Sequence, residues 1–348
     1  MLQANYKKHT FIFKTSGGTS RGVLNTKDSW YIRVWDSKKP DLKGAGECSI
    51  IKGLSYDDRP EYEERLKQLI EDINDSGEVV FAGLEEYPSI FFGLETALMD
   101  LHSGGKRILF PSEFTEGVAS IPINGLVWMG TPEYMQQQIE QKLDDGFNCI
   151  KLKIGAIDFE SEIELLKKIR NRYGKGDVEL RVDANGAFTS GDVWNKLQEL
   201  SKLKIHSIEQ PVKAGNVELM EELCRNTPIP IALDEELIGI IDEEKKTELL
   251  EFIKPQYIIL KPSLIGGIEM SEEWIGIAEE NGVDWWVTSA LEGNIGLNAI
   301  AQWIFELENP LPQGLGTGQV FSNNVNSPLT VKSGELWYDV ERKWGNLF

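Results

Sequence analysis

The chain contains few cysteines and histidines for its length. Three of its 348 residues are cysteine, and Cys48, Cys149 and Cys224 lie far apart and form no C-x-x-C pair. We therefore expect neither a disulfide framework nor a structural zinc site, and this cysteine usage fits the reducing cytoplasm. With three histidines and no G-x-S-x-G segment, the sequence also disfavours a hydrolase built on a Ser-His triad.

Positive charge and long apolar runs are scarce as well. Lysine and arginine number 36 against 56 aspartates and glutamates, which gives a net charge of −20. This balance disfavours binding to nucleic-acid phosphates or to an anionic membrane surface. No stretch approaches about 18 uninterrupted apolar residues, and residues 1–9 contain no apolar signal segment. We expect a soluble cytoplasmic protein, and the composition leaves its oligomeric state open.

The first hundred residues show strand patterns followed by helix patterns. Residues 11–13 and 30–35 are aromatic and β-branched, which predicts strands, and the glycine-rich segment 15–22 between them predicts a turn or mobile loop. Apolar residues then recur at spacings of three and four within 62–73 and within 91–101, which predicts two helices. This order predicts a small α+β domain.

From about residue 120, short apolar runs alternate with helix-length segments, which predicts a parallel α/β sheet. Thr131-Pro132 and Asp158 are typical starts for two of the helices. No G-x-G-x-x-G follows the first run, so a closed (β/α)8-type barrel is favoured over an open dinucleotide-binding sheet. The clear runs are residues 120–126, 149–154, 178–183, 206–210, 229–234, 256–261 and 283–289, and a weak eighth run would end at 314–318.

These patterns predict an α/β fold, a (β/α)8-type or modified TIM barrel with an N-terminal α+β capping domain. We expect the capping domain to span residues 1–112 and the barrel, which would carry the active site, to span 113–321. The C-terminal segment, about 322–348, would pack back on the capping domain through its run 336–338.

Charged residues stand at the carboxyl ends of five consecutive runs. They are separated by 25 to 30 residues along the chain, and the carboxyl ends of barrel strands surround one mouth, where active sites lie. One such residue alone is most often a helix cap or a solvated side chain. Five in consecutive βα units favour a shared site instead. The five residues are Lys153, Asp183, Glu209, Asp234 and Lys261.

The three carboxylates among them predict a metal site. At about 4 Å and an effective dielectric near 20, each pair of carboxylates repels by about 4 kcal/mol. A divalent cation relieves this repulsion, and oxygen-only ligation favours a hard ion such as Mg²⁺, with Mn²⁺ as a substitute. Lys153 and Lys261 would flank the ion from the two neighbouring strands.

Taken together, these segments resemble the enolase superfamily, in its muconate-lactonizing-enzyme subgroup. The resemblance covers nearly the whole chain, and its specificity lies in the joint pattern rather than in any single motif. The motifs that carry it are Lys151-Leu152-Lys153, Asp183-Ala184-Asn185-Gly186, Ile208-Glu209-Gln210-Pro211, Asp234-Glu235 and Leu260-Lys261-Pro262.

The resemblance implies Asp183, Glu209 and Asp234 as Mg²⁺ ligands and Lys153 and Lys261 as the acid/base residues. Sites of this superfamily use a Lys or His base together with one or two Mg²⁺ ions. The shared chemistry is abstraction of a proton beside a carboxylate, so the expected partner is a small-molecule carboxylate substrate.

Six further residues are candidates for contact with the substrate. We assign Lys151 a role separate from that of Lys153 because we expect the two ammonium groups to point apart. A glycine-flanked arginine in the segment 15–22 would close over the bound substrate. The candidate contacts are Lys151, Arg21, Arg181, Asn185, Ser289 and Thr317.

Within the superfamily, segments 19–24, 288–292 and 314–318 resemble the o-succinylbenzoate synthases of menaquinone biosynthesis. This implies a hydro-lyase that removes water by a syn elimination through an enediolate. Dipeptide epimerases and N-acylamino acid racemases are the alternatives, although 314–318 lacks the acidic pair that dipeptide epimerases usually carry. A non-catalytic barrel that only binds a ligand is the alternative from another class, and the two intact lysines disfavour it.

Overall fold

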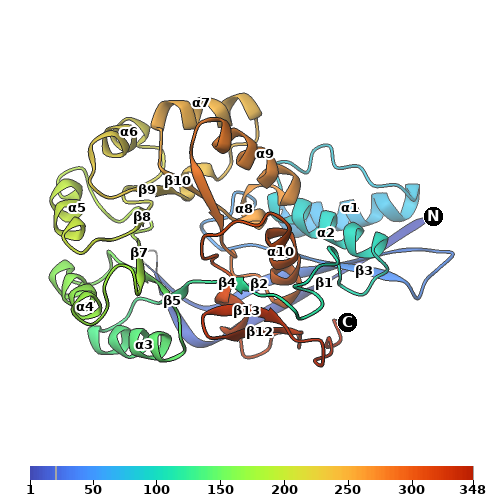
Figure 1. Cartoon of the computed structure of the whole chain (residues 1–348). Helices are drawn as coiled ribbons and strands as arrows, with labels where there is room; N and C mark the ends of the chain where they lie inside the picture. Colours follow the sequence, from blue (N-terminus) through green and yellow to red (C-terminus); the bar gives the residue numbers. More distant parts are fainter. Residues whose placement is uncertain (20–21, 348) are drawn as a thin grey trace.

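The computed structural model describes residues 1–19 and 22–347. They form an N-terminal three-stranded antiparallel sheet, a seven-stranded parallel sheet and a second three-stranded antiparallel sheet. Figure 1 shows the parallel strands inside a ring of helices, with the N-terminal sheet to one side. None of the helices in this part of the chain is long and apolar enough to cross a membrane.

A long hairpin dominates the N-terminal sheet. Strands β1 (Leu2–Thr19) and β2 (Gly22–Asp36) pair antiparallel, and β3 (Lys43–Ser49) pairs with β2. The predicted strands are confirmed. The expectation that residues 15–22 form a loop is wrong for 15–19, which continue β1 to the end of the hairpin.

The glycines near the end of β1 allow close packing rather than a wide turn. A Cβ atom on Gly18 would lie 2.3 Å from the carbonyl oxygen of Met129, and one on Gly17 would lie 3.1 Å from the ring of Trp128. The backbone N–H of Met129 donates to the carbonyl of Gly18 at 3.1 Å. The hairpin therefore rests against the barrel by direct backbone contact.

Helices α1 (Tyr62–Ser76) and α2 (Pro88–His102) pack on the N-terminal sheet, as the spacing of their apolar residues predicts. Leu66 and Ile73 of α1 and Leu94 of α2 share one buried cluster with Ile32 and Val34 of β2. This core is separate from the larger core of the barrel. The predicted α+β arrangement of this part is therefore confirmed.

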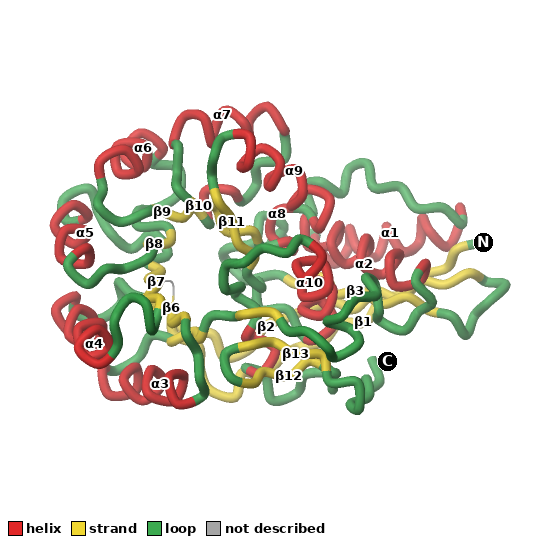
Figure 2. The backbone as a smooth tube through the Cα atoms, in the orientation of Figure 1, coloured by secondary structure: helices red, strands yellow, loops and turns green. Residues whose placement is uncertain are grey.

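The parallel sheet runs in the order β11-β10-β9-β8-β7-β6-β5, so each strand lies beside the next one along the chain. Figure 2 shows these strands curving inside the helices that connect them. The strands are β5 (Gly125–Val127), β6 (Cys149–Lys153), β7 (Glu179–Asp183), β8 (Ser207–Glu209), β9 (Ile231–Leu233), β10 (Tyr257–Leu260) and β11 (Asp284–Val287).

Two of the connecting helices begin where the sequence predicts. The Thr131 side chain accepts a hydrogen bond from the N–H of Tyr134 at 3.3 Å, and Asp158 accepts from Ser161 at 3.2 Å, as N-caps do. The helices are α3 (Pro132–Asp144), α4 (Phe159–Arg172), α5 (Val193–Ser201), α6 (Val217–Asn226), α7 (Glu243–Ile253), α8 (Pro262–Ile265), α9 (Gly267–Glu280) and α10 (Asn294–Glu306), with 3-10 turns η1 (Glu235–Leu237) and η2 (Gly316–Gln319).

The barrel closes without a regular eighth strand. The N–H of Gly314 donates to the carbonyl of Val287 at 2.8 Å, and the N–H of Gln313 donates to that of Pro122 at 2.8 Å. Residues 313–314, which we call the seam, thus link β11 to the segment that precedes β5. The predicted weak eighth run is reduced to these two bridging residues, and the fold is a modified TIM barrel.

A third sheet holds the end of the chain against the barrel. It contains β12 (Leu329–Lys332), β13 (Glu335–Tyr338) and β4 (Ile121–Pro122). The run 336–338 was expected on the N-terminal part, but Leu336 pairs with Ile121 and belongs to the barrel core. Other C-terminal residues do return to the first part, since the ring of Phe321 stacks on that of Phe11 with centroids 4.5 Å apart. The domain boundaries themselves stay a prediction.

Candidate active site

The charged strand ends meet at one end of the barrel. Parallel pairing places Lys153 beside Asp183 and Asp183 beside Glu209, one strand after another. Asp183 is fully buried, and Glu209 and Asp234 are each 2% exposed. The regular spacing along the chain therefore becomes an arc of neighbouring side chains at the carboxyl ends of β6 to β10.

Lysine ammonium groups pair with all three carboxylates. Lys153 Nζ lies 2.8 Å and Lys151 Nζ 3.1 Å from Asp183 Oδ2. Lys151 also pairs with Glu209, and Lys261 pairs with Asp234. The expectation that Lys151 and Lys153 point apart is wrong, because residues two apart on a strand share one face.

Burial and charge act in opposite directions on these groups. Burial alone would raise the pKa of Asp183, but the ammonium groups of Lys151 and Lys153 hold it well below its ordinary value. For Glu209, burial and the neighbouring carboxylate raise the pKa to about 7. Burial alone would lower the pKa of Lys261, yet adjacent carboxylates hold it above its ordinary value, so this lysine stays cationic.

The donor set suits a hard cation in its chemistry. Asp183, Glu209 and Asp234 offer oxygen atoms only, from three neighbouring strands, and Glu209 Oε1 is buried and accepts no hydrogen bond. As the side chains stand, residues 1–19 and 22–347 contain no group of three His, Cys, Asp or Glu placed to hold an ion. An incoming cation would therefore have to replace lysine ammonium groups at these oxygens.

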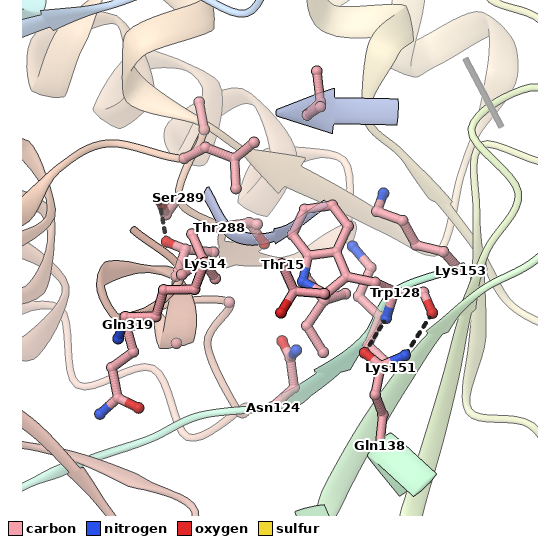
Figure 3. A pocket seen from close by; sticks show the side chains of 18 of the residues that line it. Lys14, Thr15, Asn124, Trp128, Gln138, Lys151, Lys153, Thr288, Ser289 and Gln319 are labelled. Atoms are coloured by element: carbon pink, nitrogen blue, oxygen red, sulfur yellow. Dashed lines mark hydrogen bonds between the residues drawn. The ribbon is translucent and has the colours of Figure 1, made fainter. Parts of the chain in front are cut away.

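A cavity of about 600 Å³ opens directly over the lysines. Figure 3 shows Lys151 and Lys153 on one side of it and Thr288 and Ser289 on another. Its described lining residues include six lysines and no aspartate or glutamate. This is notable in a chain with a net charge of −20. The six are Lys14, Lys52, Lys142, Lys151, Lys153 and Lys261.

Three predicted substrate contacts also line the cavity. Asn185 accepts from Lys153 Nζ at 2.8 Å, which ties it to one of the two lysines predicted to act as acid and base. Thr317 donates its hydroxyl proton to Ser289 Oγ at 2.7 Å, and Ser289 donates to Glu292 at 2.6 Å. The two hydroxyl protons are therefore already used within the protein.

Arg181 is not part of the cavity wall. It is 1% exposed, donates to Glu179 at 2.6 Å and to the carbonyl of Pro312 at 2.9 Å, and lies over the ring of Trp286. Because it precedes Asp183 by two residues on β7, it faces the barrel interior one layer deeper. Arg21 lies outside the described residues.

Sequence reasoning missed the cavity wall formed around β5. Asn124, Leu126 and Trp128 all line the cavity, whereas Val127 is buried in the barrel core. The alternation of side chains along a strand was the signal that would have found them. Gln138 on α3 fixes this edge by accepting from the N–H of Trp128 at 3.0 Å and donating to its carbonyl at 2.9 Å.

Known proteins share both the sequence and the fold. Residues 134–341 match a family described as Enolase C-terminal domain-like. The chain belongs to the enolase superfamily. The resemblance inferred from the strand-end motifs is thereby confirmed.

Relatives within the enolase superfamily align over nearly the whole chain. An o-succinylbenzoate synthase from Desulfotalea psychrophila is 44% identical over 96% of this chain and 98% of its own length. The crystal structure of MenC from that organism has a TM-score of 0.80 at 40% identity and covers 97% of this chain and 99% of its own. A dipeptide epimerase from Enterococcus faecalis has a TM-score of 0.82 at 21% identity, covers 99% of this chain and 98% of its own, and shows the shared fold.

Proposed function

We propose that this chain is an o-succinylbenzoate synthase, a hydro-lyase of menaquinone biosynthesis. Its substrate would be a cyclohexadiene carboxylate that carries a hydroxyl group and a succinyl arm. The observation that carries the proposal is the cavity itself: six lysines and no acidic side chain among its described lining residues, above three buried carboxylates. Such a cavity suits a substrate with two carboxylates, and the relative that is 44% identical bears the same activity in its name.

The same cavity disfavours a dipeptide as the substrate. A dipeptide has an ammonium group, which would need a carboxylate partner in so enclosed a site. The described lining residues supply none, and the segment 314–318 contains no acid. A binding protein without catalysis would have no use for Lys153 and Lys261, which are held beside Asp183 and Asp234 respectively.

We further propose that Asp183, Glu209 and Asp234 hold Mg²⁺, for which Mn²⁺ would substitute. When bound, the ion would supply Lewis-acid stabilisation of the negative charge that develops on the substrate carboxylate. Three carboxylates buried within one arc need compensating positive charge, which the lysines supply in this structure and which a bound ion would supply in their place.

The two lysines would divide the proton chemistry. Lys153, as a neutral amine, would remove the proton on the carbon beside the carboxylate, leaving an enediolate. The same Lys153, now an ammonium, would protonate the hydroxyl group as its C–O bond breaks, which releases water and leaves an aromatic ring. Lys261 would remain cationic and stabilise the enediolate, in line with its raised pKa.

The deciding experiment compares two reactions side by side on purified protein supplied with Mg²⁺. The first is dehydration of the succinyl-hydroxycyclohexadiene carboxylate, and the second is epimerisation of L-Ala-L-Glu and of N-succinylamino acids. Dehydration is the expected activity. Epimerisation or racemisation without dehydration would show that we assigned the chain to the wrong member of the superfamily. No turnover of any of these substrates would favour a binding protein. A cytoplasmic location, consistent with three separate free cysteines, is part of this proposal.

A further inference from the structure

Backbone hydrogen bonds across the seam connect Asn124 to the loop that follows β11. Beyond β10, the N–H of Thr288 donates to the carbonyl of Leu260, and the N–H of Ser289 donates to that of Gly314. The N–H of Asn124 then donates to the carbonyl of Gln313 at 2.9 Å. This ladder sets Asn124 across the seam from Thr288, close to the level of the strand end that bears Lys261.

The Asn124 side chain is buried at the cavity and has no hydrogen-bond partner among the described residues. The residue is 5% exposed and lines the cavity, and Figure 3 shows its carboxamide standing between the Ser289 side and the Lys151 side. Its Oδ1 is buried without a donor, and the carboxamide makes no hydrogen bond to any residue within 1–19 or 22–347. Buried polar groups are rarely left unpaired in this way.

Three other neutral polar side chains on the wall, those of Thr317, Ser289 and Gln138, already have partners, whereas the buried Oγ1 of Thr288 has none. The Thr317 hydroxyl donates to Ser289, and the Ser289 hydroxyl donates to Glu292. The Gln138 carboxamide is occupied by the backbone of Trp128. Asn124 therefore offers a free donor for a neutral or anionic oxygen of a ligand.

The position of Asn124 indicates which end of the substrate would carry the oxygen that it binds. The proposed metal ligands lie on β7 to β9, in the middle of the strand order, and Asn124 precedes β5 at the seam, the farthest point around the barrel from them. A substrate whose reacting carboxylate faces the metal ligands would extend its arm toward the seam.

We propose that the Asn124 carboxamide donates a hydrogen bond to an oxygen of the succinyl arm and selects substrates with a polar arm. The inference rests on the proposed function, because it takes the succinyl arm from the assigned substrate. Asn124 then acts in recognition and takes no part in proton transfer.

Calorimetric binding of two ligands tests this contact. The first ligand is the product, o-succinylbenzoate, and the second is 2-butylbenzoate, whose arm has the same four carbons but no oxygen. Asn124→Leu should weaken o-succinylbenzoate binding about tenfold, the value of one hydrogen bond, and leave 2-butylbenzoate binding unchanged. The melting temperature should not fall, since no protein group loses a partner.

Controls separate the possible failures. Asn226→Leu makes the same change on the exposed end of α6, outside the cavity lining, and should affect neither ligand. Equal weakening of both ligands by Asn124→Leu, unchanged binding of the product, or a clear loss of melting temperature would each overturn the arm contact. In those cases wild-type turnover would still support the proposed function. Wild-type protein that bound neither ligand and did not dehydrate the substrate would overturn both.

Discussion

Glu47 accepts a hydrogen bond from the backbone N–H of Gly293 at 2.7 Å, and this contact joins the N-terminal sheet to the start of α10. Its second oxygen accepts from the N–H of Gly296 at 3.0 Å. A carboxylate at a helix N-terminus pairs with N–H groups that lack partners within the helix. Because α10 follows the loop that carries Ser289 and Glu292, Glu47 holds a cavity wall in place from outside the barrel.

Replacing Glu47 should therefore destabilise the whole protein. Glu47→Ala would leave two buried N–H groups without an acceptor, and we expect a loss of about 2–4 kcal/mol in the free energy of unfolding, measured in urea. Glu47→Gln keeps one acceptor oxygen and should lose less. The exposed Glu61→Ala, a control in the same part of the chain, should stay within about 0.5 kcal/mol of wild type. A Glu47→Ala variant as stable as this control would contradict the assigned role.

Removing either of the two lysines proposed as acid/base residues should strongly lower turnover. We expect Lys153→Ala and Lys261→Ala each to lower kcat for the dehydration by at least about 10²-fold, the contribution of a positioned acid or base. Circular dichroism with Mg²⁺ present checks that the variants fold. Lys167→Ala removes an exposed lysine paired with Glu164 and should keep the wild-type rate. A catalytic-lysine variant with wild-type kcat would refute the role given to that residue.

Metal binding should be visible without any assay of turnover. At 100 times its Kd, Mg²⁺ should stabilise the folded protein by about 2.7 kcal/mol and raise the melting temperature. Asp183→Asn should remove this shift, whereas Asp192→Asn, on the surface before α5, should retain it. A chelator should also abolish turnover, and Mg²⁺ should restore it. Full activity in the presence of chelator would disprove the metal site.

Glu95 should make stability depend on pH. It accepts from the N–H groups of Ile268 and Glu269 at 2.7 and 2.9 Å, and burial raises its pKa to about 7. The folded state therefore keeps this proton to a higher pH than the unfolded chain, whose pKa is near 4.5. The free energy of unfolding should then fall as pH rises from about 4.5 to 7.

Comparison with Glu95→Gln isolates this effect from other titrating groups. The stability of wild type relative to the variant should decline by about 1–3 kcal/mol between pH 5 and pH 7.5, measured by urea unfolding at each pH. A relative stability that stayed constant or increased over this range would show that Glu95 keeps an ordinary pKa.

Ser289 should matter less for affinity than its place on the wall suggests. Because its proton is donated to Glu292, Ser289→Ala removes no donor aimed at the ligand, and we expect the Kd for o-succinylbenzoate to change by less than about threefold. A tenfold weakening, again by calorimetry, would return Ser289 to the direct contacts that the sequence predicts.

The arc of charged side chains could be predicted because its sequence signals are local and repeated. Asp183 and Lys261 each end a short apolar run, and parallel strands bring such ends together whatever the details of packing. The seam and Arg181 could not be predicted in the same way. Residues 313–314 are placed by hydrogen bonds to Val287 and Pro122, which no local pattern encodes, and the depth of Arg181 depends on which layer of the barrel interior it enters.

Glycine-rich composition did not predict the structure of residues 15–19 correctly. Gly17 and Gly18 resemble turn residues in the sequence, yet Gly18 is required because β1 approaches the backbone of Met129 too closely for a side chain, and Gly17 packs tightly on the ring of Trp128. A glycine signals either conformational freedom or close contact, and the sequence alone does not distinguish the two. The unpaired carboxamide of Asn124 likewise depends on how side chains from distant segments pair around the cavity, which no local pattern encodes.

The strand ends that carry the charged residues and the irregular wall beside the seam differ in how readily they can be redesigned. The lysines and carboxylates lie on regular strands held by parallel pairing or directly after them, whereas the wall at residues 313–317 is irregular backbone held by a few hydrogen bonds. Laboratory evolution aimed at new carboxylate substrates should therefore accumulate its useful changes along the seam, with affinity for the cation unaltered. A library confined to that strip is small enough to screen completely.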